Sequence, residues 1–266
     1  MSKFIFAIFP NETKAYEGTR ILKDLHAEGS LTLYDLAVVT KGADGALAVK
    51  DAADSGPIGT GVGALVGGLT GLLGGPAGAV VGMGVGALAG SLADVFNMGI
   101  GADFLDKVSK ELTPGKTAIV AEVEEDWVTP LDTRMAAIGG VVVRQRRADF
   151  EEEQLEKQVE ADKADIAQLQ DEWTHATGEA KAKLSAQIDA AKVKLQDASD
   201  RMDVQIARMH KESDAKMAAL QKQVATATAD AKARIDQRMS ELRASHERRS
   251  AKLRQAWKLA KEALAS

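Results

Sequence analysis

The segment from residue 55 to residue 93 most constrains what this chain can fold into, because it lacks charged residues and repeats glycine at every fourth position. The repeat runs in two sets, separated by Gly75-Pro76-Ala77. Its members are Gly59, Gly63, Gly67, Gly71, Gly75, Gly78, Gly82, Gly86 and Gly90. A period of four places each set along one ridge of a helix, where bare glycines let another backbone approach closely. The segment therefore predicts two glycine-zipper helices joined as a hairpin.

A flexible linker is the alternative interpretation of this tract. Linkers are rich in polar residues, whereas leucines and valines such as Leu65, Leu69 and Val85 interleave these glycines. Each glycine costs a helix about 1 kcal/mol relative to alanine. A helix of this composition must therefore be buried, against its hairpin partner and then against lipid or other subunits. The absence of charge favours lipid, while arms short of the ~20 residues that cross a bilayer leave a soluble assembly open.

The residues on either side of the tract predict one α+β domain, split between 1–54 and 94–147. Strands are expected at 4–9, 31–40, 46–50, 117–123 and 141–144, and helices at 11–26, 102–112 and 129–138. Phe4–Phe9 is apolar at every position, which is typical of a strand buried on both faces. We expect Asn11 and Thr129 to cap their helices. The order β-α-β, insertion, β-α-β predicts a ferredoxin-like sandwich carrying the hairpin of residues 55–93.

Residues 148–266 predict a long helix or coiled coil, because they contain no proline and a single glycine, Gly178, where a fold-back is possible. From Met202 onward an apolar stripe repeats every eleven residues, which indicates a straight or slightly right-handed coil. The stripe comprises Met202, Ile206, Met209, Met217, Leu220, Val224, Ile235, Met239, Leu242, Leu253, Trp257 and Leu264.

Little in the composition indicates a reaction. There is no cysteine, four histidines lack ligand spacing, and the net charge of −5 is too mild to imply nucleic acid. Gly115-Lys116-Thr117 resembles a phosphate loop but leads into a strand instead of a helix. The acidic stretch from Glu122 to Asp126, at the end of a strand, is expected to be a solvated loop, with a divalent-cation site as the alternative. We therefore predict no catalytic, cofactor-binding or metal-binding residues, and no enzymatic activity.

Three sequence features resemble a known family. These are LTLYDLAVVTKGADGALAVKD at residues 31–51, the glycine-rich hairpin, and ELTPGKTAIVAEVEEDW at residues 111–127. Together they resemble the bacterial "domain of unknown function 1269" proteins, often labelled predicted membrane proteins, over residues 1–147. The resemblance implies a glycine-zipper hairpin inserted in an α+β module, and it carries no catalytic residues to this chain.

The sequence thus predicts a homo-oligomeric structural protein that assembles through its zipper hairpins and its coiled coil. Its expected partners are further copies of itself and membrane lipid, and other protein partners are unknown. It is expected at the cytoplasmic face of the inner membrane, or in the cytoplasm, because the first apolar run is too short for a secretory signal. The alternatives are a soluble assembly with hairpins buried between subunits, a pore or transport component, and a small-ligand regulatory module.

Overall fold

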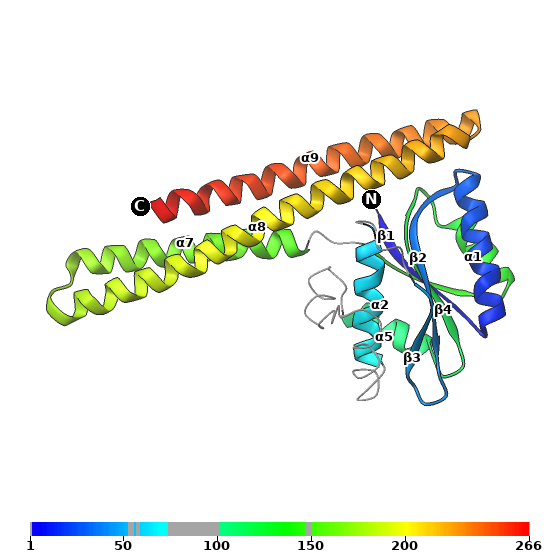
Figure 1. The fold of residues 1–266 in the computed structure, drawn as a ribbon, viewed down its shortest axis with the longest axis horizontal. Coiled ribbons are helices and arrows are strands. Elements are labelled where there is room, and N and C mark those ends of the chain that lie inside the picture. Colours follow the sequence, from blue (N-terminus) through cyan, green and yellow to red (C-terminus); the bar gives the residue numbers. More distant parts are fainter. Residues whose placement is uncertain (1, 53–55, 57–58, 74–101, 147–149, 266) are drawn as a thin grey trace. The chain divides into compact units, whose positions relative to one another are not determined.

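The computed structural model describes residues 2–52, 56, 59–73, 102–146 and 150–265. The strands are β1 (Lys3–Phe9), β2 (Leu31–Lys41), β3 (Leu47–Asp51), β4 (Thr117–Glu125) and β5 (Val141–Arg146). The helices are α1 (Glu12–Ala27), α2 (Gly59–Leu73), α5 (Ala102–Glu111), α6 (Thr129–Ala137), α7 (Phe150–His175), α8 (Gly178–Thr226) and α9 (Ala229–Ala265) (Figure 1). They form two compact units, Met1–Ala148 with Glu212–Arg243, and Asp149–Lys211 with Ala244–Ser266. Helices α8 and α9 therefore contribute to both.

The first unit is built on a five-stranded sheet in the order β3-β2-β4-β1-β5, with every neighbouring pair antiparallel. The predicted strand at residues 4–9 is confirmed, and it lies between β4 and β5. From Phe4 to Phe9 no residue is more than 2% exposed. Apolar side chains on both faces require a layer of helices on each side of the sheet, which confirms an α+β class.

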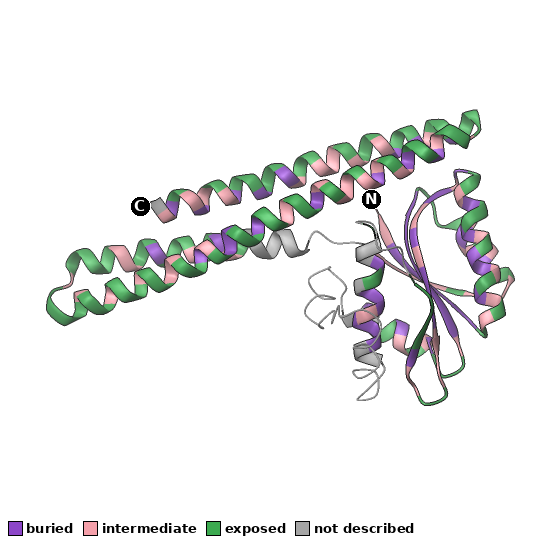
Figure 2. Cartoon of the chain, viewed as in Figure 1, coloured by how far each residue is buried: buried purple, intermediate pink, exposed green. Residues whose placement is uncertain are grey.

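Helices cover both faces of this sheet (Figure 1). On one face α1 and α6 pack Leu22, Leu25 and Met135 against residues such as Ile5. On the other face α2 and α5 bury a second apolar cluster, whose members include Val62, Leu65, Leu69, Phe104 and Val108 together with Phe4 and Phe6 of β1. In Figure 2 the buried positions of α1 and α2 lie on the sides turned toward the sheet.

The helix starts on this sheet confirm one predicted cap and correct the other. Asn11 caps α1, since its side chain accepts a hydrogen bond of 2.9 Å from the Lys14 amide. Thr129 does not cap α6, because the helix begins one residue earlier than expected. Its cap position is Val128, which has no capping side chain and whose carbonyl accepts from the Asp132 amide at 3.0 Å. Thr129 is therefore already the first helical residue.

Strand β2 contains a β-bulge. Leu33 lies opposite Val123 and Asp35 lies opposite Glu122, so Tyr34 is an extra residue without a partner in the register. The extra residue shifts the alternation of the side chains. As a result Leu33, before the bulge, and Leu36, after it, both pack on the α1 side of the sheet.

Helix α2 is the described part of the glycine tract. It contains Gly59, Gly63, Gly67 and Gly71, whereas Gly75, Gly78, Gly82, Gly86 and Gly90 lie outside the described residues. Its apolar side chains, including Leu65 and Leu69, pack against the module's own sheet, although we expected them to meet a hairpin partner, lipid or another subunit. Gly63 is exposed, and a Cβ added there meets no described atom within 4 Å. None of the helices described here has the length and apolar character needed to cross a membrane.

The residues after 148 form three helices instead of one. The break that the sequence left possible near Gly178 is present, since α7 ends at His175 and Gly178 takes a positive φ of 57°. A second break, at residues 227–228, was not predicted, because the eleven-residue stripe continues from Val224 to Ile235 on either side of it. The surrounding Ala-Thr-Ala-Thr stretch explains it, since threonine hydroxyls compete for backbone carbonyls. Here Thr226 Oγ1 donates to the Gln223 carbonyl at 3.3 Å as α8 ends.

The second unit joins α7 to the outer parts of α8 and α9. Its core consists of small and medium apolar side chains from all three helices: Val159, Ile166, Leu195, Ala198, Met202, Ala256, Ala260 and Ala263. The rings of His210 on α8 and His246 on α9 also meet edge to face, with Nδ1 of His210 and Nε2 of His246 3.0 Å apart. The second unit therefore has an apolar core of its own.

Candidate site: a polar clasp between the helical tip and the sheet

The most unusual chemistry in the first unit lies where residues 212–243, the helical tip, meet the α+β module. The apolar part of this contact is small, with Leu220, Ala231 and Ile235 as its fully buried members. The approach is close, because a Cβ added to Gly29 would lie 2.5 Å from Cβ of Ala231. Gly29 also has a positive φ of 71°, which suits glycine. The contact also contains three buried polar side chains of the tip, Lys216, Gln223 and Arg238, and we call them and their partners the polar clasp.

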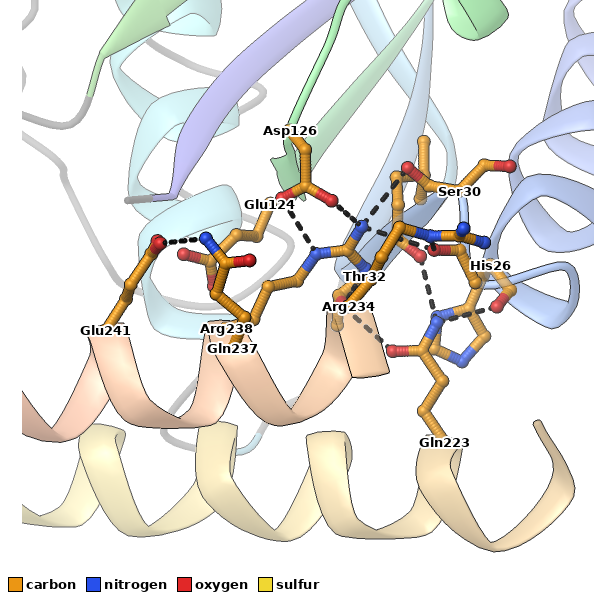
Figure 3. Close-up of polar contacts among 12 residues, drawn as sticks. His26, Ser30, Thr32, Glu124, Asp126, Gln223, Arg234, Gln237, Arg238 and Glu241 are labelled. Carbon is orange, nitrogen blue, oxygen red and sulfur yellow. Dashed lines mark hydrogen bonds and ion pairs between the residues drawn. The ribbon is translucent and has the colours of Figure 1, made fainter. Parts of the chain in front are cut away.

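Arg238 of α9 is the centre of the clasp and is completely buried. Its guanidinium grips Asp126 through two nitrogens, with Nε 3.3 Å from Oδ1 and Nη2 2.7 Å from Oδ2 (Figure 3). Nη1 donates to Thr32 Oγ1 at 3.1 Å, and Nη2 also donates to the carbonyls of Gly29 and Ser30 at 3.2 and 3.3 Å. Because arginine keeps its charge, burial demands such a full set of acceptors.

Gln223 of α8 forms the second point of the clasp. Its Nε2 donates to the carbonyls of His26 and Leu31, at 2.6 and 2.9 Å. Its Oε1 accepts from the Thr32 hydroxyl at 2.8 Å. Since Thr32 also accepts from Arg238, this hydroxyl links the two helices of the tip through one strand of the sheet. The three side chains satisfy one another, as a buried polar network must.

Lys216 of α8 forms the third point. Its ammonium lies 2.5 Å from Glu122 Oε1, 2.7 Å from Glu212 Oε1 and 3.2 Å from Ser2 Oγ. The side chains of Lys216 and Glu122 are 5% and 0% exposed. A buried ion pair of this kind contributes little net stability, but removing one partner leaves the other charge buried and unpaired. It therefore selects one docking geometry for the tip.

The acidic end of β4 supplies the carboxylates of the clasp, Glu122 and the adjoining Asp126, which corrects the prediction of a solvated loop. The strand continues to Glu125, and Glu122, Glu124 and Glu125 are all at least 94% buried. Glu124 accepts a hydrogen bond of 2.6 Å from the Tyr34 hydroxyl. Burial, followed by the negative charge of Glu124, raises the pKa of Tyr34, so the phenol keeps its proton. Within the described residues, no group of three or more His, Asp or Glu side chains is placed to hold a metal ion.

His26, at the end of α1, adjoins the clasp. Its Nδ1 accepts from the Leu33 amide at 3.2 Å, which places the proton of the neutral ring on Nε2. The pKa of His26 is lowered, first by burial and then by the positive charges of Arg238 and Lys222. Both of those cations belong to the helical tip.

The stripe predicted from the sequence lies on the inner sides of the helices. Met202, Met209, Leu220, Ile235 and Leu253 are buried, and Ile206, Met217, Val224, Met239, Leu242, Trp257 and Leu264 are partly buried.

The sequence analysis missed the clasp residues, although a signal was present. Lys216 and Gln223 flank Leu220 at helical spacing, and Arg238 follows Ile235 by three residues. Polar side chains on an apolar stripe mark positions where a partner must satisfy them.

Comparison with known proteins gives a family match over part of this chain. The model of the DUF1269 family, described as a protein of unknown function, matches residues 60–160, from α2 into α7. This match supports the family resemblance found in the sequence, over the residues that the two share. No curated protein and no solved structure matches this chain.

Proposed function

We propose that this protein is a non-enzymatic, homo-oligomeric structural protein. In this proposal the α+β module holds the tip of a long helical hairpin, and copies associate through the glycine side of α2 and through the helices. We also infer a ferredoxin-like sandwich at the centre of the module. The order β2-β4-β1-β5, with α1 and α6 on one face, supports this topology.

The polar clasp is the observation that carries the structural role. Three buried polar side chains of the tip, Lys216, Gln223 and Arg238, each meet matched groups on the sheet. An apolar contact of similar size would hold the tip as well but would tolerate sliding. Buried polar groups are best attested as devices that fix register. A fixed register between a head and a long helix is what a spacer or scaffold requires.

Self-association is proposed through α2. One side of this helix is committed to the sheet through Val62, Leu65 and Leu69. Gly63 lies elsewhere on the helix, exposed and with room for an approaching backbone. Because the apolar side of α2 packs on protein, a soluble assembly is favoured over insertion in lipid. Attachment to the cytoplasmic membrane is the competing form of the same proposal.

The test is the mass of the full chain, measured by light scattering over a range of concentrations. We expect a multiple of 28.1 kDa, a smaller species for Gly63→Leu, and an intermediate effect for Gly63→Ala. Lys107→Leu, at an exposed position of α5, is the matched control and should leave the mass unchanged. A wild-type mass of one chain at all concentrations, or a Gly63→Leu mass equal to wild type, would refute the proposal.

An alkaline carbonate wash of cell membranes separates the two forms. Recovery of the chain in the soluble fraction supports the soluble assembly. Retention in the washed pellet until detergent is added supports lipid insertion and rejects the soluble form.

A further inference from the structure

His26 occupies a place in the clasp where a proton changes the docking contacts. Its backbone carbonyl accepts from Gln223 of the tip, and its ring Nδ1 accepts from the Leu33 amide. The ring bond requires a lone pair on Nδ1, so it exists only while that nitrogen is unprotonated. The ring and the carbonyl belong to one residue, and a movement of the ring therefore reaches the contact with the tip.

The charged groups that face this ring are cations. Arg238 of α9 and Lys222 of α8 both act on it. On α1 itself the nearest charged residue at helical spacing is Lys23, three positions earlier. Leu33, the residue of β2 whose amide donates to the ring, carries no charge. A proton on His26 would thus add a third positive charge beside two cations of the tip, with the carboxylate of Asp126 already engaged by Arg238.

We propose that His26 is a proton-sensitive gate, and that protonation of its ring releases the helical tip from the α+β module. The added proton sits on Nδ1, which breaks the bond from the Leu33 amide. The imidazolium then repels Arg238 and Lys222, and the tip moves away with its three clasp residues. This regulation goes beyond the structural role proposed above and does not depend on oligomerisation.

Linkage fixes the direction and the size of the effect. In the docked state the pKa of His26 is lowered by burial and by two cations of the tip, and undocking removes the cations and restores solvent. The undocked state therefore binds more protons at mildly acidic pH. Docking is fully favoured above the ordinary histidine value of about 6.5 and weakens as the pH falls below it, down to the docked pKa. One proton limits the change to about tenfold in the docking equilibrium for each pH unit.

The absence of cysteine in the sequence makes docking directly measurable. Spin labels on Arg20→Cys in α1 and Lys232→Cys in α9 occupy exposed positions outside the clasp. Distances between the labels are recorded from pH 8 to pH 5.5. Wild type should show a growing undocked population below about pH 6.5. His26→Asn, whose Oδ1 replaces Nδ1 as an acceptor and takes no proton, should stay docked throughout. His175→Asn, at an exposed site on α7, should follow wild type.

A wild-type chain that stays docked to pH 5.5, or an equal pH response in wild type and His26→Asn, would overturn the gate. If His26→Asn is undocked at every pH, the test is the titration of the His26 ring, compared between wild type and Arg238→Met. The titration midpoint of His26, followed by NMR, should rise when Arg238→Met removes a facing cation and frees the tip. An unchanged midpoint in Arg238→Met would overturn the gate as well.

Discussion

Replacement of Arg238 by methionine tests whether the clasp holds the helical tip. Methionine keeps most of the volume of the side chain while removing its charge and its donors. The variant leaves the Asp126 carboxylate without its bidentate partner and leaves the carbonyls of Gly29 and Ser30 without these donors. Thr32 keeps its bond to Gln223. The loss is therefore concentrated on one carboxylate and two carbonyls.

The expected loss of docking free energy depends on how far the groups that Arg238 contacts are exposed to water. Breaking a fully buried ion pair costs about 3–5 kcal/mol. The Asp126 side chain is 32% exposed, so water replaces part of the lost contact. Hydrogen bonds to charged groups contribute about 1.5–3 kcal/mol in net terms. We expect docking of the tip to weaken by about 2–3 kcal/mol, which is roughly a 30- to 160-fold change in its opening equilibrium.

Hydrogen exchange of the amides in residues 212–243 reports on that opening equilibrium, because helices released from the sheet open locally more readily. Arg238→Met should accelerate exchange there by the predicted factor and leave β1 and β5 protected. Gln237→Met changes the preceding residue, which is exposed, and serves as the control. An exchange rate within about twofold of wild type in Arg238→Met would show that the apolar contacts alone seat the tip, and the reasoning on the clasp would be wrong.

Three further changes test the packing of the first unit. Lys216→Met leaves the carboxylate of Glu122 without its ammonium partner, and we expect a loss of about 3–5 kcal/mol in urea unfolding. Gly18→Ala brings a Cβ to within 2.5 Å of the Phe9 ring. Although alanine is the better helix former, we expect the free energy of unfolding to fall by about 1–3 kcal/mol, which a lower melting temperature would show. Leu65→Ala opens a cavity under α2 and should cost about 2–5 kcal/mol, whereas a change below about 0.5 kcal/mol would mean that α2 does not pack on the sheet.

Local signals in the sequence predicted most of the module. The apolar run Phe4–Phe9 and the Asn11 cap each act within a few residues, and the structure has β1 and α1 where they indicate. The prediction that Thr129 caps its helix was wrong by one residue, because several helix starts have similar free energies and packing selects among them. The break at residue 178 was visible because a lone glycine in a long helical segment is a strong local signal.

The clasp was not predictable in the same way. Arg238 and Asp126 are 112 residues apart in the chain, and no local pattern pairs them. The acidic end of β4 was expected to be solvated because carboxylates are rarely buried without partners. The partners of Glu122 and Asp126, Lys216 and Arg238, lie on helices whose place on the sheet depends on long-range packing. The polar residues inside the stripe indicated that some partner exists, but not which one.

The bulge at Tyr34 has a consequence for how this strand can change in evolution. Before it, Leu31 and Leu33 lie on the α1 side, and after it Leu36 and Val38 lie on that same side. The extra residue thus changes which sequence positions, odd or even, face α1 in the second half of β2. Loss of Tyr34 alone would make Leu33 and Asp35 successive residues opposite Val123 and Glu122, so the strand would alternate regularly and both halves would keep their present sides. Relatives that lose a single residue of β2 should therefore lose it at this bulge.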